Sequence, residues 1–244
     1  MRDTPHFTAN QFLDFVLGLT HGDRGDLGIQ EDVLITYVGQ PQSKGAVWEM
    51  EEPRIRLFPG PVRANAHGTL IRGPIGAPHA ASTIEELKAA GARRLWVLGY
   101  AGSLREEFPL GTVVPVGRAL SDEGTSRHYF RSGWALPNHD MTARLMKALP
   151  GRTAALWTTD AVYRETAEKI REFRQQGCDL VDMETACYFH VGEAIGLQVA
   201  ALMVVSDELF HAWTPGFGSS PVTEGVSEAW RVLESVLNWG GQPS

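Results

Sequence analysis

Cysteine is scarce in this chain of 244 residues: only Cys178 and Cys187 occur, and no Cys-x-x-Cys pair is present. Two cysteines cannot build a disulfide framework, so we expect reduced thiols and a cytoplasmic protein. The first residues lack a basic segment followed by an apolar run, and the longest apolar stretch, near 199–205, is too short to span a bilayer. The sequence therefore predicts neither a signal peptide nor a membrane partner.

Positive charge is also in short supply. The chain holds 22 Lys and Arg against 29 Asp and Glu, which gives a formal net charge of -7. A nucleic-acid partner requires a basic footprint, so this balance predicts none. The eight histidines are dispersed, with neither a His-Glu-x-x-His motif nor a Cys/His cluster, and we expect no metal and no other cofactor.

Glycine, in contrast, is plentiful, with 26 residues beside 14 prolines, and these residues are scattered rather than periodic. Scattered glycines indicate tight backbone turns, some of them around a ligand, rather than a collagen-like or low-complexity chain. A composition of 43% hydrophobic and 21% charged residues is typical of globular proteins. Because no linker interrupts the chain, its length predicts one domain spanning residues 1–244.

Short apolar runs alternate with helical patterns along the chain. The runs expected to form strands are 33–38, 67–72, 95–98, 112–116, 153–156 and 199–205. The segments expected to form helices are 82–91, which opens with the capping-box spacing of Ser82 and Glu85, then 166–176, 184–195 and 223–239. This order predicts the α/β class, a single-domain mixed β-sheet flanked by helices, in which ligands bind at the carboxyl ends of strands.

One candidate site follows the apolar strand at 95–98. Gly99-Tyr100-Ala101-Gly102 holds two glycines three residues apart, which let a backbone approach a ligand closely. The exposed N–H groups of such a loop bind an anion or a polar ring. The segment matches neither a Gly-x-Gly-x-x-Gly pattern nor a P-loop, and the alternative is an ordinary tight turn.

Acidic residues end two further strands. Asp182-Met183-Glu184 stands just before a helix, where a carboxylate can accept hydrogen bonds from vicinal hydroxyls and Met183 offers an apolar floor for a sugar ring. Ser206-Asp207 closes the most apolar strand, and a partly desolvated carboxyl group there suits proton donation. The alternative for Asp182 and Glu184 is that they are acidic residues at a helix N-terminus, which the helix dipole favours. The alternative for Asp207 is that it caps the turn after the strand.

Taken together, these segments resemble the nucleoside phosphorylase family, in the superfamily of single-domain purine nucleoside and uridine phosphorylases. Val181-Asp182-Met183-Glu184-Thr185-Ala186 is similar to the acid-Met-Glu signature that opens a helix in that family, and Val205-Ser206-Asp207 to its catalytic Ser-Asp. Gly73-Pro74-Ile75-Gly76-Ala77-Pro78 is similar to its glycine turn. The stretches 121–129 and 158–166 also resemble segments of uridine and purine phosphorylase-like members.

The resemblance implies a role for each matching residue. Asp207, next to Ser206, would be the general acid that protonates a purine at N7. Glu184 would hold the ribose 2′-hydroxyl, with Met183 packed under the ribose and Asp182 beside them. The other substrate contacts would be Gly99, Tyr100, Ala101 and Gly102 at base and phosphate, Val162 and Tyr163 at the base, and His128 at the 5′-hydroxyl. The resemblance also implies a homo-oligomer (dimer, trimer or hexamer) with inorganic phosphate as co-substrate.

The chain departs from the family where phosphate should bind. Val97 stands where many phosphorylases have an arginine, and Tyr100 where they have serine or threonine. After the first strand the chain reads Gly39-Gln40-Pro41, without the aspartate of the family's Gly-Asp-Pro turn. The arginines that could bind phosphate instead are Arg54, Arg72 and Arg127, with Arg56 and Arg164 as further candidates. Each of them is otherwise a solvated surface residue.

Three functions fit this pattern. The first is phosphorolysis of a nucleoside to free base and ribose 1-phosphate, with a purine favoured over uridine because uracil has no N7 to protonate. The second is a hydrolytic nucleosidase, which fits the missing arginine at Val97 and leaves Glu31 as the early acid to activate water. The third is a non-catalytic nucleoside-binding or assembly protein, although such a protein has little need of the proton donor Asp207.

Overall fold

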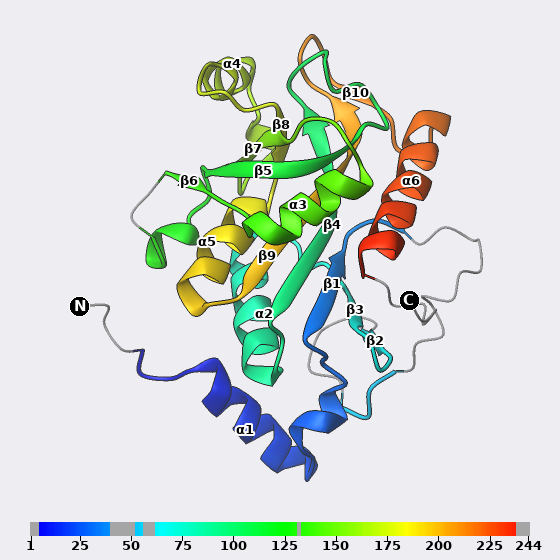
Figure 1. Ribbon diagram of the computed structural model, residues 1–244. Coiled ribbons are helices and arrows are strands. Elements are labelled where there is room, and N and C mark those ends of the chain that lie inside the picture. Colours follow the sequence, from blue (N-terminus) through cyan, green and yellow to red (C-terminus); the bar gives the residue numbers. More distant parts are fainter. Residues whose placement is uncertain (1–4, 40–51, 56–61, 131–132, 238–244) are drawn as a thin grey trace.

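The computed structural model of the protein describes residues 5–39, 52–55, 62–130 and 133–237 (Figure 1). Among these residues the centre of the fold is one mixed sheet with the strand order β10-β9-β5-β7-β8-β4-β1-β3-β2, and β6 pairs with β5. The strands are β1 Asp32–Thr36, β2 Val62–Ala64, β3 Thr69–Arg72, β4 Arg94–Ser103, β5 Val113–Ser121, β6 Trp134–Ala135, β7 Ala154–Thr158, β8 Leu180–Asp182, β9 Gln198–Glu208 and β10 Thr214–Pro215. Because β4 also pairs with β9, the strands β9, β5, β7, β8 and β4 close into a ring.

Helices cover both faces of this sheet (Figure 1). They are α1 Ala9–Thr20, α2 Ala77–Ala90, α3 His139–Ala148, α4 Ala167–Gln175, α5 Thr185–Ile195 and α6 Ser220–Leu237, with the short turns η1 Arg24–Leu27, η3 Ser126–His128 and η4 Val162–Arg164. Alternate strand residues point to opposite faces. In β1, Val33 and Ile35 therefore join the core with α2 and α5, whereas Leu34 joins the core with α3 and α6. The predicted α/β class, a mixed sheet flanked by helices, is confirmed.

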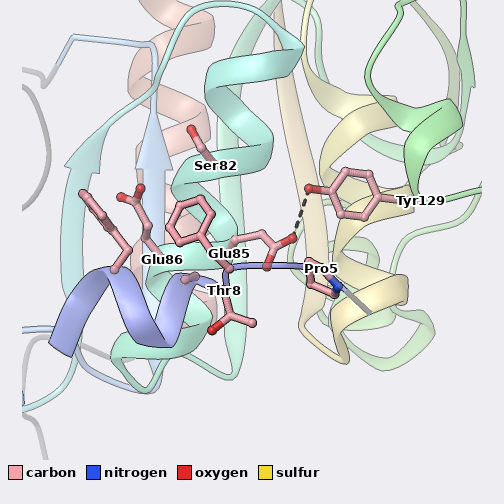
Figure 2. Close-up of a pocket in the computed structure, with 9 residues that line it drawn as sticks. Pro5, Thr8, Ser82, Glu85, Glu86 and Tyr129 are labelled. Atoms are coloured by element: carbon pink, nitrogen blue, oxygen red, sulfur yellow. Dashed lines mark hydrogen bonds between the residues drawn. The ribbon is translucent and has the colours of Figure 1, made fainter. Parts of the chain in front are cut away.

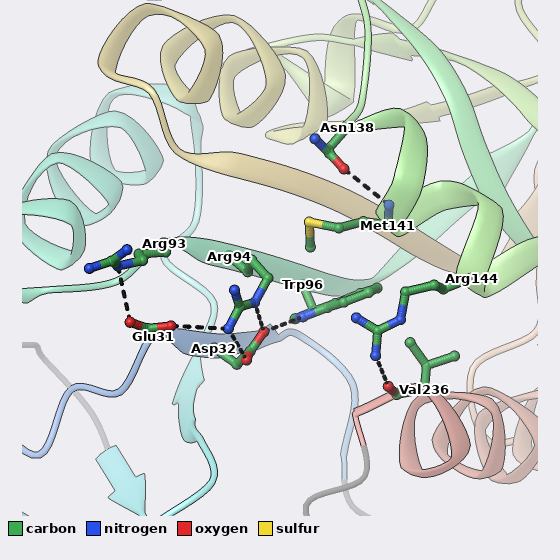
Figure 3. Close-up of polar contacts among 9 residues, drawn as sticks. All are labelled: Glu31, Asp32, Arg93, Arg94, Trp96, Asn138, Met141, Arg144 and Val236. Atoms are coloured by element: carbon green, nitrogen blue, oxygen red, sulfur yellow. Dashed lines mark hydrogen bonds and ion pairs between the residues drawn. The ribbon is translucent and has the colours of Figure 1, made fainter.

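A cluster of charged side chains joins the amino-terminal ends of β1 and β4 (Figure 3). Arg94 Nε donates to Asp32 Oδ1 at 2.7 Å, and Trp96 Nε1 donates to the same oxygen at 3.2 Å. Burial alone would raise the pKa of Asp32, but these donors hold that pKa below its ordinary value. Glu31 lies beside them and pairs with Arg93 at 3.1 Å. The opposite, carboxyl ends of the strands are where ligands are expected.

The start of α2 differs from its prediction. The sequence predicts a helix from Ser82, but α2 begins at Ala77, and the Ser82 hydroxyl donates inside the helix to His79 O. Pro78 in the first turn explains the earlier start, because proline is favoured at this position and needs no hydrogen-bonded N–H there. Gly91 ends the helix in a left-handed conformation, as predicted.

The other helices are partly predicted. The helices α4 and α5 match the expected 166–176 and 184–195, and α6 begins three residues before the expected 223. The last two residues of the predicted 223–239 lie outside the described residues. The helices α1 and α3 have no counterpart in the prediction, although both begin with side chains that accept from backbone N–H groups, Thr8 from Gln11 and Asn138 from Met141.

The strand β4 is longer than the predicted strand at 95–98. It runs to Ser103 and pairs in parallel with β9 from Arg94 to Ala101, then, after a shift of one residue, from Gly102 to Ser103. Its end also pairs with β8. The prediction of a loop at Gly99–Gly102 is therefore wrong, because pairing with two neighbouring strands extends the sheet through these glycines.

Candidate active site

A cavity of about 370 Å³ lies where β4, β8 and β9 end. This volume is in the range of small-molecule sites. The predicted site residues that line it are Gly99, Tyr100, Ala101, Gly102, Val162, Asp182, Met183, Glu184, Ser206 and Asp207, and the other lining residues are Tyr37, Ile75, Val97, Glu165, Val181, Met203 and Phe217. The structure thus brings the three predicted strand ends together at one place.

The glycines of β4 make room for neighbouring side chains. A Cβ on Gly99 would lie 2.8 Å from Met203 Sδ, and a Cβ on Gly102 would collide with Leu209 and lie 3.4 Å from Asp207 Oδ2. Glycine at 99 therefore lets Met203 reach the cavity, and glycine at 102 leaves space for the side chain of Leu209. Close packing between strands, rather than the approach of a ligand to an open loop, accounts for both glycines.

Asp207 lies in β9, and two donors hold its half-buried carboxyl group. Ser206 Oγ donates to Oδ1 at 2.7 Å, and the indole Nε1 of Trp213 donates to Oδ2 at 3.1 Å. A donor on each oxygen fixes the orientation of the carboxyl group toward the cavity. Trp213 follows β9 on the segment leading to β10, and nothing in the sequence connects it with Asp207.

Glu184 is only 8% exposed and accepts a hydrogen bond from the backbone N–H of Gly76 at 2.6 Å. This bond ties the turn before α2 to the start of α5. Burial, and then the charge of Asp182, raise the pKa of Glu184 above its ordinary value. A carboxylate in this position gains stability from further hydrogen-bond donors, such as the hydroxyls of a sugar.

Both carboxylate oxygens of Asp182 accept hydrogen bonds from other residues of the protein. Thr158 Oγ1 donates to its Oδ1 at 2.7 Å, and the backbone N–H of Thr185 donates to its Oδ2 at 2.9 Å. Burial raises the pKa of Asp182, and these hydrogen bonds oppose the shift. The geometry therefore favours Glu184 as the acid that meets a substrate and Asp182 as the acid that fixes the beginning of α5.

Glu165 is a cavity-lining acid that the sequence does not single out. It stands directly after η4, and its pKa is raised to about 7 by burial and then by the charges of Asp207 and Asp182. The signal available for it is its place inside the stretch 158–166, which carries part of the family resemblance. The residue type alone gives no reason to choose it.

Tyr37 also lines the cavity, from the carboxyl end of β1. Its hydroxyl donates to Pro74 O at 2.8 Å and lies 2.8 Å from the hydroxyl oxygen of Tyr188. A Cβ on Gly73 would lie 2.5 Å from the Tyr37 ring, so glycine at 73 allows the ring to take this place. Burial is the main reason that the pKa of Tyr37 is raised.

Three of the predicted contact residues lie away from this cavity. Tyr163 is 96% exposed and does not line it, although Val162 beside it does. His128, in η3, lines a different cavity of about 1060 Å³. Its neighbour Arg127 is exposed. Within one chain, the structure therefore does not bring these three side chains to the residues around Asp207.

The arginines predicted to bind phosphate are dispersed. Arg54 is 72% exposed and pairs with Asp26 at 3.2 Å. Arg72 lines a separate depression of about 310 Å³ together with Arg63, and Tyr37 lines both this depression and the active-site cavity. The described residues that line the active-site cavity include no lysine, arginine or histidine. Gln40, Pro41 and Arg56 lie outside the described residues.

In the part of the chain that the structure describes, no three His, Cys, Asp or Glu side chains gather in a way that could hold a metal ion. None of the helices described is both long and apolar enough to cross a membrane.

Comparison with known proteins places this site in context. The sequence model of the phosphorylase superfamily matches residues 55–228. A guanosine phosphorylase from Halorubrum lacusprofundi is 27% identical over 147 residues, which are 58% of this chain and 61% of that protein. The purine nucleoside phosphorylase of Toxoplasma gondii has a similar structure, with a TM-score of 0.72 at 18% identity over 87% of this chain and 92% of that chain. An AMP nucleosidase from Bacteroides thetaiotaomicron gives a TM-score of 0.69 at 21% identity over 94% and 98% of the two chains.

The fold and the site define an α/β protein with an acid-lined cavity at the ends of its central strands. The chain belongs to the phosphorylase superfamily, whose sequence model covers most of its length. The predicted resemblance to the nucleoside phosphorylases is thereby confirmed. The chain spans about half to six-tenths of the length of the curated relatives that it matches, and its likeness to the solved structures concerns the fold.

Proposed function

We propose that this protein cleaves the N-glycosidic bond of a purine nucleoside with inorganic phosphate, releasing the free base and ribose 1-phosphate. The observation that carries the proposal is the convergence of Asp207 and Glu184 on one cavity. The reaction needs an acid for the leaving base and an acceptor for the sugar hydroxyls, and these two residues supply both. A guanosine phosphorylase among the relatives supports a purine substrate.

Asp207 acts on the base. In its protonated form it gives its proton to purine N7 while the bond between C1′ and N9 breaks and the bonding electron pair moves into the base. Without this proton the base would leave as an anion, and a positioned general acid contributes roughly 10²–10⁴ in rate. Ser206 and Trp213 hold the carboxyl group in the orientation that this transfer requires.

Glu184 and Met183 act on the sugar. Glu184 accepts a hydrogen bond from the ribose 2′-hydroxyl, and Met183 offers its thioether to the apolar face of the ring. Positive charge develops on the ribose as the glycosidic bond breaks, and a carboxylate fixed in a desolvated site stabilises that charge. A phosphate oxygen then forms the new bond to C1′, and we propose that no cofactor takes part.

Among the predicted arginines, the geometry favours Arg72 as the phosphate contact. Arg72 pairs in register with Thr36 at the end of β1, and Arg63 lies diagonally across the β2–β3 pair on the same face. The two cations make a positive depression, and Tyr37 lies between this depression and the cavity. Arg54 and Arg127 line neither this depression nor the active-site cavity.

The experiment that tests this function measures the release of base from inosine and guanosine by the purified protein, with and without inorganic phosphate. We expect base release only with phosphate, together with one equivalent of ribose 1-phosphate. Release of base and free ribose in phosphate-free buffer would contradict phosphorolysis. No release from any nucleoside under either condition would contradict the enzyme assignment as a whole.

Hydrolysis is the second candidate, because the described lining of the cavity offers no cation for phosphate. The similar structure of an AMP nucleosidase shows that the fold also occurs in a nucleosidase. The acid predicted to activate water, Glu31, does not support this candidate. It pairs with Arg93 (Figure 3). This pair lies at the amino-terminal ends of β1 and β4, whereas the cavity lies where β4, β8 and β9 end.

A further inference from the structure

The active-site cavity and the depression that shares Tyr37 with it carry charges of opposite sign. The described residues that line the cavity include four acids and no lysine, arginine or histidine. The residues that line the depression include Arg63 and Arg72 and, in the described part of the chain, no acid. An anion is therefore repelled at the cavity and attracted at the depression.

No acid neutralises the two arginines of the depression. Arg63 pairs with Leu70 across β2 and β3, and Arg72 lies two residues beyond Leu70, so both arginines point to the same face. Both are exposed, and among the described residues neither has a hydrogen-bond or ion-pair partner. Like charges on neighbouring strands repel each other. An anion bound between the two guanidinium groups would remove this repulsion.

These arginines do not stand where the family resemblance places a cation. That cation would take the place of Val97 on β4, in the lining of the cavity. Arg63 and Arg72 stand on β2 and β3 instead, and β1 lies between β3 and β4 in the sheet. Arg72 is in register with Thr36, the last residue of β1, and Tyr37 follows directly. The positive charge of this chain is thus separated from the cavity by the end of β1.

Tyr37 is held in place as the wall between the depression and the cavity. A Cβ on Gly73 would lie 2.5 Å from its ring, and a Cβ on Gly99 would lie 3.9 Å from its Cδ2. Its hydroxyl donates to Pro74 O at 2.8 Å, so the hydroxyl of Tyr188, at 2.8 Å, must donate to Tyr37. These two hydrogen bonds keep the ring between the two hollows.

We propose that Arg63 and Arg72 form a port that binds inorganic phosphate, and that Tyr37 is the gate through which the bound anion reaches the nucleoside. The two substrates then enter from different sides of Tyr37, and neither blocks the entry of the other. The gate rests on the proposed function, in which phosphate attacks C1′ of a nucleoside in the cavity. In its closed position the Tyr37 ring also keeps water of the depression away from the glycosidic bond.

The port is tested by the steady-state kinetics of Arg63→Gln with phosphate as the varied substrate. We expect KM for phosphate to rise by at least about tenfold, the effect of one lost charge-assisted hydrogen bond, while KM for the nucleoside and kcat at saturating phosphate stay within about twofold. The matched control is Arg171→Gln, an exposed arginine of α4 that lines neither hollow, and its constants should equal those of the wild type. An unchanged KM for phosphate, or an equal change of KM for both substrates, would overturn the port.

The gate is tested by two substitutions of Tyr37. Tyr37→Phe keeps the ring and loses both hydrogen bonds of the hydroxyl, so KM for phosphate should fall by at least about threefold. Tyr37→Ala joins the depression to the cavity, so release of free ribose in phosphate-free buffer should rise by at least about tenfold over the wild type. An unchanged or higher KM for phosphate in Tyr37→Phe would overturn the gate, and this variant decides alone if Tyr37→Ala does not fold. Absence of free ribose with folded Tyr37→Ala would also overturn it.

Equilibrium binding separates the port from the proposed function. Calorimetric titration with inorganic phosphate, without nucleoside, should give a dissociation constant at least about tenfold higher for Arg63→Gln than for the wild-type protein. If the wild-type protein cleaves no nucleoside but binds phosphate through Arg63, the proposed function fails and the port stands. If the wild-type protein binds no phosphate, or Arg63→Gln binds it equally well, the port fails whatever the cleavage assay shows.

Discussion

At the scale of single residues, two acids separated by one methionine have different tasks. Both oxygens of Asp182 accept hydrogen bonds from Thr158 and Thr185, and this arrangement fixes the start of α5. Glu184 lines the cavity with Gly76 N–H as its backbone donor. The difference follows from the neighbours of each side chain and not from residue type, so it predicts unequal effects of replacing the two acids.

Replacing Glu184 by glutamine should lower kcat/KM for a ribonucleoside by about 100-fold, because a charge-assisted hydrogen bond and the stabilisation of the developing positive charge are both lost. With a 2′-deoxynucleoside the loss should be clearly smaller, since that substrate lacks the hydroxyl which Glu184 contacts. Steady-state kinetics with both substrates check this. Glu193→Gln, an exposed position on the same helix, is the control, and equal losses with both substrates would contradict the role of Glu184.

The sequence contains enough information to find some of these residues and not others. Asp207 and Glu184 can be predicted because each acid follows an apolar strand, where the ends of strands converge. Glu165, Trp213 and Tyr37 cannot be predicted in the same way. Glu165, after η4, and Tyr37, at the end of β1, line the cavity, and Trp213, between β9 and β10, donates to Asp207. These three positions depend on how separate segments fold together.

At the scale of elements, a pair of glycines sets the distance between α6 and the turn before β5. A Cβ on Gly225, in α6, would collide with the carbonyl oxygen of Gly111, and Gly111 itself has a φ of 81°. The obstacle is backbone, which cannot move aside as a flexible side chain can. The position therefore requires glycine although glycine disfavours helices.

Gly225→Ala should lower the free energy of unfolding by roughly 1–3 kcal/mol, because overpacking against a backbone atom exceeds the gain in helix propensity. The matched variant is Gly18→Ala in α1, where no heavy atom lies within 4 Å of the new Cβ. That substitution should raise the free energy of unfolding by about 1 kcal/mol. Urea denaturation of both variants measures the two values, and the same sign for both would refute this account of α6.

The elements that could be predicted are those whose ends carry local signals. The helix α5 lies between Glu184 and the C-cap Gly196, and α4 lies between the N-cap Thr166 and the C-cap Gln176, which Gly177 follows. The length of β4 could not be predicted. Its last five residues are strand because β9 pairs with all of them and β8 pairs with the last two, and such pairing between distant segments leaves no trace in the local sequence.

At the scale of the whole molecule, acids with raised pKa values make stability depend on pH. The pKa of Glu165 is about 7 in the folded protein against an ordinary value of 4.5, so the folded state binds more protons between these values. The contribution of Glu165 is therefore complete below pH 4.5 and is lost as the pH rises through 7. Glu184 and Asp182, whose pKa values burial also raises, act in the same direction.

We expect the slope of unfolding free energy against pH, measured by urea denaturation between pH 5 and 8, to be less negative in Glu165→Gln than in the wild-type protein. His190, whose pKa is lowered by burial, acts in the opposite sense below about pH 6.5, so the comparison between variants isolates Glu165. Glu168→Gln should follow the wild-type curve. Coincident curves for Glu165→Gln and the wild type would show that the carboxyl group is not perturbed by its surroundings.

The surface around α1 bears on assembly. Phe15 and Leu19 of α1 and the preceding Phe7 are large apolar side chains that face solvent. Between α1 and α2 lies a further cavity of about 310 Å³, at whose edge the Tyr129 hydroxyl donates to Glu85 at 3.0 Å (Figure 2). Exposed apolar side chains of this kind are typical of protein interfaces. The homo-oligomer implied by the family resemblance stays a prediction, and a monomeric mass by light scattering would contradict it.

The central claim is that Asp207 protonates a purine as it leaves the ribose. The most direct measurement is the turnover number for inosine at saturating phosphate in the wild-type protein and in Asp207→Ala, with the exposed Asp140→Ala in α3 as control. The account predicts that Asp207→Ala has a turnover number at least about 100-fold lower and an unchanged circular dichroism spectrum. The turnover number of the control should not change. A turnover number for Asp207→Ala within about threefold of the wild-type value would contradict it, since a general acid contributes far more than that.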